Sequence, residues 1–498
     1  MGEIRYVAND TAPLFAAATG SRVLIELLWG DQARLLEAGA ARSRVRARGR
    51  TGWIDNAALG EQSLLEIYLI DVGQGDGILI RTPDDRHLMV DGGYRRAAQP
   101  TGKNAADFVD WKFAKDYGRD TIKLDAMLAS HCDADHYGGL SDLLDVAQND
   151  ELDAKKLQVE AFYHAGVGWW TNPANQQRWL GAPSADKKYL LQLMGSRNAV
   201  LAALKPGAVP RLQGEWAEFM GRVCQARTSA GKPTPIRRLS QRDGLLPGFE
   251  GGGGSGGDVA IHVLAPVERQ VEGRPALRRY GTDSKATNGN SLLLRLDYGR
   301  ARFLLTGDLN AEAQRALLED YAGRRIEFQC DMAKACHHGS EDVSYEFLAA
   351  LRPAVTVISS GDSEGHDHPR PAIVAASATT GHLQVEQDRI VTPLVYSTEI
   401  ARSVQLGRPQ RLTVPGPAGG KGQSYGAAEL APIKLEASVT RPGDLKPGTQ
   451  TRSLGSTLIV AGLIYGLVNI RSDGHKILCA TLNEKDHSWQ VRSFVSRF

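Results

Sequence analysis

Two histidines and two aspartates fall within six residues of one another, directly after a short apolar run. The sequence from Ser130 to Gly139 is SHCDADHYGG, and the apolar run Leu124–Ala129 precedes it. Four ionisable side chains this close cannot share an apolar interior, because each unpaired charge would carry a large desolvation penalty. A loop that leaves the end of a buried strand can direct them toward one point, where a cation offsets their charge. The segment therefore predicts a metal site at the edge of a sheet.

The composition is that of a soluble globular protein. The chain has 498 residues, of which 42% are hydrophobic and 23% are charged. Because single cores rarely grow beyond about 250–300 residues, we expect about two to four folded units. The 59 Lys and Arg against 57 Asp and Glu give a net charge of +2, so overall charge neither indicates nor excludes an anionic partner.

Cysteine usage and hydropathy indicate the compartment. The five cysteines form no Cys-x-x-Cys pair, and an odd number argues against a disulfide framework. The first residues lack the basic and apolar regions of a secretory signal. The longest apolar run, residues 458–468, is shorter than a bilayer span and contains glycine. We therefore expect a cytoplasmic protein with no membrane partner.

Residues 1–62 mix short apolar runs with polar positions, which favours short strands and tight turns over helices. The sequence VRARGRTGWI at residues 45–54 resembles the last hairpin of bacterial SH3-like modules. This resemblance implies a small N-terminal all-β, SH3-like domain. Such a module could dock the chain to a substrate, a protein or another ligand.

Five arginines occupy alternate positions in this region, namely Arg42, Arg44, Arg46, Arg48 and Arg50. On a strand they would share one face. The stripe could bind phosphates, or it could protect a solvated edge strand from aggregation. Of these two interpretations we favour the edge strand.

Beyond residue 62, apolar runs of strand length alternate with helical patterns. This alternation predicts an α/β domain over residues 63–400 with a largely buried sheet. A polar stretch over residues 165–257 is an insertion, and we expect its tryptophans Trp169, Trp170 and Trp179 to pack a local lid rather than stack on bases. Residues 401–498 form a β-rich extension that either completes the main sheet or folds separately.

Six short motifs follow one another along the chain. They are Asp71–Asp76 (DVGQGD), Val90–Gly93 (VDGG), Ser130–Gly139, Thr306–Asp308 (TGD), His337–Ser340 (HHGS) and Gly365–Pro369 (GHDHP). In this order they resemble the metallo-β-lactamase superfamily, and within it the hydrolase domain of ComEC-type DNA-uptake proteins. The resemblance spans residues 64–380 and implies a four-layer αββα sandwich with metals at one edge of two facing sheets. The membrane channel of the competence proteins has no counterpart in this sequence, so a role in DNA import does not transfer.

The resemblance also implies a ligand set for two divalent metal ions. His131 and Asp133 would serve the first metal, Asp135 and His136 the second, Asp308 would bridge them, and His337 or His338 would complete the second site. Many members of the superfamily have histidine where this chain has Asp133. Oxygen-rich ligation favours Mn²⁺ or Mg²⁺ relative to Zn²⁺, although zinc also fits.

Further roles follow from this expected site. Asp133 or Asp135 could orient the attacking water, and His366 or His368 could steady the developing charge or donate a proton. Asn290 and Ser340 could bind the phosphate by hydrogen bonds. Asp71 and Asp76 are expected to anchor a turn and orient ligands, and Asp91 to support a ligand from behind.

Three functions compete at this stage. The first is a two-metal phosphodiesterase or nuclease whose partner is nucleic acid, with DNA preferred. The second is a hydrolase of a small ester or nucleotide, which a narrow pocket closed by the insertion would favour. The third is an inactive binding or regulatory protein, and the near-complete ligand set argues against it. We favour the first, because the oxygen-rich first site suits phosphodiester chemistry.

Overall fold

A computed structural model gives the fold of the chain. It describes residues 2–98, 104–145, 152–253, 257–361, 368–399, 403–414, 416, 422–439, 448–457, 459–464, 466–483 and 488–498. The chain forms two compact units: one comprises Met1–Ala401 and Tyr465–Phe498, and the other comprises Arg402–Ile464. Among the described helices, none has the length and apolar character needed to cross a bilayer.

The N-terminal region is an all-antiparallel sheet of seven short strands. The strands are β1 (Ile4–Val7), β2 (Thr11–Phe15), β3 (Val23–Leu28), β4 (Gln32–Glu37), β5 (Arg42–Ala47), β6 (Arg50–Asp55) and β7 (Leu59–Gly60). Their order in the sheet is β3-β2-β6-β5-β4-β1-β7. Alternate side chains such as Leu14, Val45 and Ile54 form its own buried core. The predicted short strands are confirmed, and the SH3-like identity stays a prediction.

The prediction that the arginine stripe lies on an edge strand is wrong. β5 carries the first arginines of the stripe, and it pairs with β4 on one side and β6 on the other. Arg42 is bound to Asp55 at 2.7 Å, and Arg48 lies in a turn with φ 45° and its guanidinium over the Trp489 ring. The alternation therefore reflects an inner strand and a tight turn, because sequence period alone does not reveal which strands flank it.

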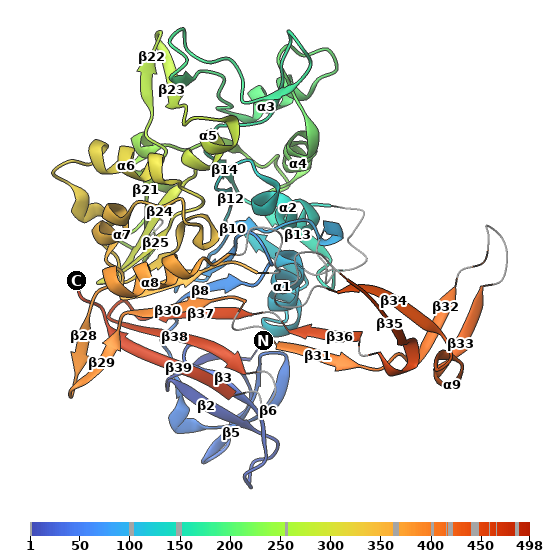
Figure 1. Cartoon of the computed structure of the whole chain (residues 1–498). Helices are drawn as coiled ribbons and strands as arrows, with labels where there is room; N and C mark the ends of the chain where they lie inside the picture. Colours follow the sequence, from blue (N-terminus) through green and yellow to red (C-terminus); the bar gives the residue numbers. More distant parts are fainter. Residues whose placement is uncertain are drawn as a thin grey trace. The chain divides into compact units, whose positions relative to one another are not determined.

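Two large sheets lie at the centre of the rest of the first unit (Figure 1). The nine-stranded sheet has the order β19 (Ile236–Arg238), β14 (Phe162–His164), β12 (Ala126–Ala129), β10 (His87–Gly92), β9 (Gly77–Arg81), β8 (Leu65–Ile70), β37 (Leu467–Ser472), β38 (Lys476–Asn483) and β39 (Ser488–Val495). The seven-stranded sheet has the order β20 (Leu245–Glu250), β21 (Ala260–Ala265), β24 (Leu293–Tyr298), β25 (Ala301–Leu305), β26 (Met332–Lys334), β27 (Val355–Ile358) and β30 (Leu394–Ser397).

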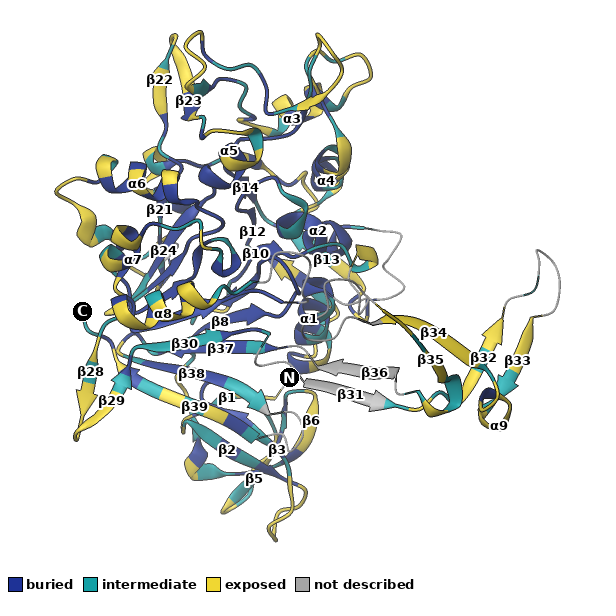
Figure 2. Ribbon diagram, viewed as in Figure 1, coloured by how far each residue is buried: buried dark blue, intermediate teal, exposed yellow. Residues whose placement is uncertain are grey.

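The two sheets face each other across a shared apolar core. Side chains from both sheets, including Ile67, Leu128, Leu294 and Phe303, belong to one buried cluster. Helices cover the outer faces: α1 (Ala105–Trp111) and α2 (Ala134–Leu143) pack on the first sheet, and α6 (Ala311–Asp320) and α7 (Tyr345–Leu351) on the second. Figure 2 shows the strands between these helices as buried. The arrangement is an α/β sandwich of four layers.

Parallel pairing brings the functional loops to one edge. β10, β12 and β14 run parallel in the first sheet, and β25, β26 and β27 run parallel in the second. The carboxyl end of β12 leads to the 130–136 segment, and those of β25 and β26 lead to Asp308 and to His337 with His338. Parallel strands deliver their following loops to the same sheet edge, which is why residues distant in sequence meet there.

The insertion after β14 packs into the same apolar core as α1, α2 and the outer face of the nine-stranded sheet. It contains β15 (Trp170–Thr171), β16 (Arg178–Trp179), β17 (Tyr189–Leu190), α3 (Arg197–Leu204), β18 (Arg211–Leu212) and α4 (Gly214–Gln225), and the later hairpin β22 (Arg269–Val271) and β23 (Arg274–Arg278) pairs with it through β17. Trp169 and Trp170 are buried among residues of this insertion and of α2. Their burial fits packing of a lid rather than stacking on bases.

The last segment of the chain contributes to both units. β37 pairs antiparallel with β8, and β38 and β39 extend the nine-stranded sheet. The described residues of the second unit include the antiparallel pairs β31 (Ser403–Gly407) with β36 (Ile459–Ile464), β32 (Arg411–Val414) with β33 (Gln423–Gly426) and β34 (Lys434–Val439) with β35 (Gly448–Ser453), and the short helix α9 (Ala427–Leu430).

Candidate metal centre

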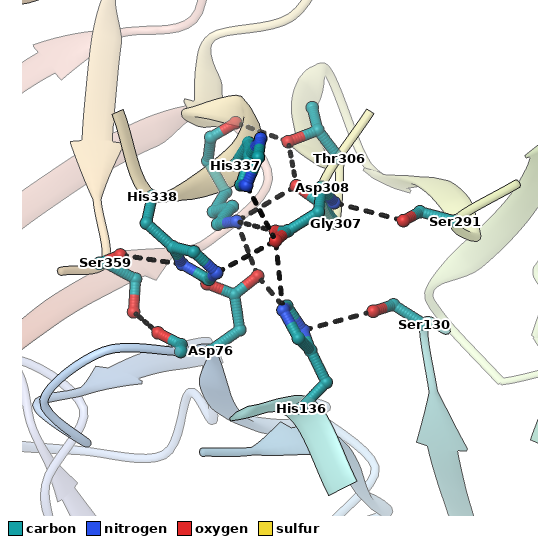
Figure 3. Close-up of polar contacts among 12 residues, drawn as sticks. Asp76, Ser130, His136, Ser291, Thr306, Gly307, Asp308, His337, His338 and Ser359 are labelled. Atoms are coloured by element: carbon teal, nitrogen blue, oxygen red, sulfur yellow. Dashed lines mark hydrogen bonds and ion pairs between the residues drawn. The ribbon is translucent and has the colours of Figure 1, made fainter. Parts of the chain in front are cut away.

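Buried carboxylates and imidazoles from three parts of the sequence meet at one edge of the sandwich (Figure 3). Ligand atoms of Asp135, His136, Asp308 and His338 all lie within 4.8 Å of one another. His136 Nε2 lies 3.2 Å from Asp308 Oδ2, and His338 Nε2 lies 2.9 Å from the same oxygen. The structure thus brings together four residues to which the sequence assigned a metal.

The start of α2 positions the first half of this cluster. Asp133 precedes the helix in an extended conformation, and Asp135 and His136 lie in its first turn. The following glycines let the helix sit directly on the backbone after β10, since a Cβ on Gly139 would lie 2.1 Å from the Gly92 carbonyl oxygen. The Gly-Gly pair therefore fixes how deeply the two ligands reach into the site.

His131 and Asp133 form a second pair beside the cluster. His131 Nε2 lies 3.7 Å from Asp133 Oδ2, and the His131 and His136 ring centroids are 4.0 Å apart. His131 Nδ1 contacts the hydroxyls of Ser130 at 3.0 Å and Ser291 at 3.3 Å. The side chain of Asp133 is 25% exposed, which places it at the mouth of the site.

The two adjacent histidines occupy different positions. Both have left-handed backbone angles, with φ 48° at His337 and 53° at His338, a conformation costly for a residue with a Cβ. His338 is buried, and its Nδ1 lies 3.1 Å from the Ser359 carbonyl oxygen while Nε2 faces Asp308. His337 is 26% exposed, and its Nε2 lies 3.9 Å from Asp308 Oδ2. His338 therefore belongs to the buried cluster, and His337 lies at its rim.

Asp91 supports His136 from behind. Asp91 Oδ2 lies 2.9 Å from His136 Nδ1, and Asp91 Oδ1 accepts a hydrogen bond from the Ser130 backbone N–H at 2.7 Å. A carboxylate at Nδ1 orients the ring and leaves Nε2 to face the cluster. Ser291 has a similar role, since its Oγ contacts His131 and accepts from the Asp308 N–H.

Sequence reasoning missed Lys334, and it expected Asp76 to anchor a turn and orient ligands. Lys334 Nζ lies 2.5 Å from Asp76 Oδ2 and 3.5 Å from Asp308 Oδ1, and both partners are buried. Asp76 Oδ1 also lies 3.4 Å from His338 Nδ1. A lysine in the otherwise apolar strand β26 was the available signal, because a fully buried ammonium requires a carboxylate partner.

The remaining predicted residues lie outside the buried cluster. Asn290 is buried, and its amide donates to the carbonyl oxygens of Arg278 and Ala286, whereas Asn288 faces the site with Nδ2 3.5 Å from His337 Nε2. Ser340 Oγ accepts from the Asp342 N–H. The His368 ring lies 5.8 Å from the His337 ring. His366 lies outside the described residues.

Burial and charge set the ionisation of the cluster. Burial lowers the pKa of His131 to about 3, which keeps the imidazole in the neutral form that a metal ligand needs. Burial, followed by the Asp135 carboxylate, raises the pKa of Asp133 to about 7. Burial also opposes ionisation of Asp308, but the nearby His338 and His136 hold its pKa well below the usual value.

The donor atoms face one another without satisfying one another. Nε2 of His131, His136 and His338 is buried, and none of the three makes a hydrogen bond to a described residue, even where Asp308 Oδ2 is near. Unsatisfied buried polar atoms are costly, and a divalent cation between them would satisfy them. The donors therefore fit a metal cluster, with His131 and Asp133 beside the four-residue set.

Comparison with known proteins gives one family. The family model described as Metallo-beta-lactamase superfamily matches residues 70–360. ComE operon protein 3 of Bacillus subtilis is 21% identical over 320 residues, which are 62% of this chain and 30% of that protein. Competence protein ComA of Neisseria gonorrhoeae is 35% identical over 101 residues, which are 20% of this chain and 14% of that protein. The chain thus spans less than a third of the length of either curated relative.

One solved structure aligns with most of the chain. It is a crystal structure of a new diphosphatase from the PhnP family, 10% identical, and the alignment covers 67% of this chain and 94% of that chain with a TM-score of 0.28.

Proposed function

The chain belongs to the metallo-β-lactamase superfamily, and from this premise we propose that it is a two-metal phosphodiesterase that cleaves nucleic acid, with DNA as the preferred substrate. The observation that carries the proposal is the buried set Asp135, His136, Asp308 and His338, with His131 and Asp133 beside it. Its relationship to two competence proteins supports a nucleic-acid substrate.

Two divalent cations held by these residues would activate a water molecule and neutralise charge on the phosphate. The carboxylate at Asp133 makes the donor set rich in oxygen, which supports Mn²⁺, with Zn²⁺ or Mg²⁺ as alternatives. Asp133 at the mouth would orient the water. His337 and His368 on the rim would contact the substrate, where a proton donor or a charge-stabilising group is needed.

The other parts of the proposal concern location and docking. All five cysteines are buried free thiols, which supports a cytoplasmic location. The N-terminal sheet would act as an SH3-like docking module for a protein or another ligand. Both statements are independent of the chemistry at the metal centre.

A substrate and metal panel tests the proposal. Purified protein is incubated with single-stranded DNA, double-stranded DNA, RNA, bis-p-nitrophenyl phosphate, p-nitrophenyl acetate and a nucleoside triphosphate, each with Mn²⁺, Mg²⁺ or Zn²⁺ added. We expect metal-dependent cleavage of DNA and of the chromogenic diester, and its loss in Asp135→Ala and Asp308→Ala. Cleavage of a carboxylic ester or nucleotide alone would favour a small-molecule hydrolase, and cleavage of no substrate would contradict the proposal.

A further inference from the structure

The insertion that follows β14 is strongly basic. Residues 165–257 contain twelve Lys and Arg against five Asp and Glu, although the whole chain has a net charge of only +2. Figure 1 shows this part, with α3, α4 and the β22–β23 hairpin, at the end of the sandwich toward which β12 and β14 lead. Local positive charge beside a phosphodiester site is the general requirement for holding a polyanion.

One arginine of the insertion is fixed next to the metal centre. The Trp169 indole N–H donates to the Cys132 carbonyl oxygen at 2.8 Å, which ties the indole to the residue before Asp133. Arg178 Cζ lies 3.5 Å from the centroid of the Trp169 ring. β15 and β16 hold this geometry, because Thr171 is paired with Arg178 in their antiparallel ladder.

The Arg178 guanidinium is positioned by the Trp169 ring, and its N–H groups are available to bind a ligand. Arg178 is exposed, and its side chain makes neither an ion pair nor a hydrogen bond with any residue that the structure describes. Stacking on an aromatic face uses the plane of the guanidinium and leaves its N–H groups directed outward. It is close enough to Asp133 and Cys132 to act on both electrostatically.

We propose that Arg178, stacked on Trp169, binds a phosphate of a nucleic-acid strand next to the one being cleaved, and so makes the site selective for polynucleotides over small diesters. This inference rests on the proposed function for its substrate class. Arg178 is then a specificity determinant, since a diester with a single phosphate, such as bis-p-nitrophenyl phosphate, has no second phosphate to reach it.

The experiment compares wild type, Arg178→Gln and a matched control, Arg274→Gln. Arg274 is exposed at the start of β23, in the hairpin that pairs with the insertion through β17, and it lies 3.8 Å from the Glu272 carboxylate. We measure kcat/KM with Mn²⁺ on single-stranded DNA and RNA oligonucleotides and on bis-p-nitrophenyl phosphate. Metal-free binding of a labelled oligonucleotide is measured by fluorescence anisotropy against salt concentration.

Loss of one phosphate contact should reduce kcat/KM on the oligonucleotides about 10-fold in Arg178→Gln and leave the chromogenic diester within about 2-fold. The slope of log affinity against log salt should become shallower by about 0.7 for a single strand. Arg274→Gln should match wild type, and the DNA and RNA arms show which strand is preferred.

Other results would overturn the inference. Equal losses on polymer and small diester would mean that Arg178 acts on the metal centre or the fold. Unchanged oligonucleotide binding and cleavage in Arg178→Gln, or no oligonucleotide binding by wild type, would exclude the contact. If wild type binds oligonucleotides but cleaves no phosphodiester, the proposed function fails while the salt-slope comparison still decides the role of Arg178.

Discussion

The Lys334 ammonium lies 2.5 Å from Asp76 Oδ2, with both side chains fully buried. Lys334 also lies 3.5 Å from Asp308 Oδ1, while Asp308 Oδ2 faces the histidines. One fixed positive charge therefore stands behind two carboxylates of the metal centre. The two oxygens of the Asp308 carboxylate therefore face different partners: Oδ1 faces the Lys334 ammonium, and Oδ2 faces the histidines of the cluster.

Replacing Lys334 should destabilise the metal-free protein. Lys334→Met removes the buried cation that faces both Asp76 and Asp308, for which we expect a loss of about 3–5 kcal/mol in the free energy of unfolding. Added Mn²⁺ should reduce the loss, because the metal neutralises Asp308. Urea unfolding with and without Mn²⁺ measures both effects. Lys123→Met is the control, since its pair with Asp125 has a 47% exposed lysine; equal losses in the two variants would refute the account.

The adjacent histidines His337 and His338 should contribute differently to metal affinity. His338→Ala removes the buried imidazole whose Nε2 lies 2.9 Å from Asp308 Oδ2, and we expect at least a 10-fold weaker Mn²⁺ affinity. His337→Ala, at 3.9 Å and on the rim, should retain most of the affinity and lose activity instead. Calorimetric titration of both variants with Mn²⁺ makes the comparison. A larger loss of affinity in His337→Ala would reverse the assignment.

A buried ion pair joins the N-terminal sheet to the sandwich. Arg471 Nη2 on β37 lies 2.7 Å from Asp31 Oδ1, and both side chains are 2% exposed. Arg471→Met should cost about 3–5 kcal/mol, because it leaves Asp31 buried without its cation, and wild type should unfold in a single transition, because the two parts share this contact. Arg5→Gln, which breaks an exposed pair with Glu61, should cost under about 1 kcal/mol. Separate transitions for the two parts in wild type would show that the junction is weak.

His87 should make the protein sensitive to acid. It is buried between Phe113 and Tyr117, and burial lowers its pKa to about 3. The unfolded chain binds a proton below about pH 6.5 that the folded chain does not, so stability falls as pH drops from about 6.5 toward 3. His87→Phe should therefore gain stability relative to wild type at pH 5 compared with pH 7. Denaturant midpoints at the two pH values test this, with exposed His475→Gln as control; parallel shifts in both variants would argue against His87.

The sequence could predict most of the candidate ligands because they lie in short local motifs. Asp135 and His136 follow one apolar strand and Asp308 follows another, and parallel strands bring such ends together. The choice between His337 and His338 was beyond the sequence, since it depends on two consecutive left-handed residues. From the sequence we named Asn290 and not Asn288, because only the geometry at the end of α5 (Asp283–Gly289) decides which amide faces the site.

Long-range pairing accounts for most of what could not be foreseen. The position of β5 inside its sheet and the pairing of β37 with β8 depend on which strands meet. The spacing of apolar residues along the sequence does not predict strand pairing. The role of Lys334 could not be predicted from a local motif, because its partner Asp76 lies far away in sequence. These features are determined by burial of charge and by sheet topology, which motifs do not encode.

The most direct test of the metal centre measures release of p-nitrophenol from bis-p-nitrophenyl phosphate as Mn²⁺ is titrated into metal-free wild type and Asp308→Asn. Circular dichroism of both proteins checks that the variant is folded. We expect wild-type activity to rise with Mn²⁺ and to saturate, and Asp308→Asn to lose at least about 100-fold in kcat/KM, because its carboxylate faces both His136 and His338. Equal activity in a folded Asp308→Asn variant, or wild-type hydrolysis unaffected by removal and return of metal, would contradict the central claim.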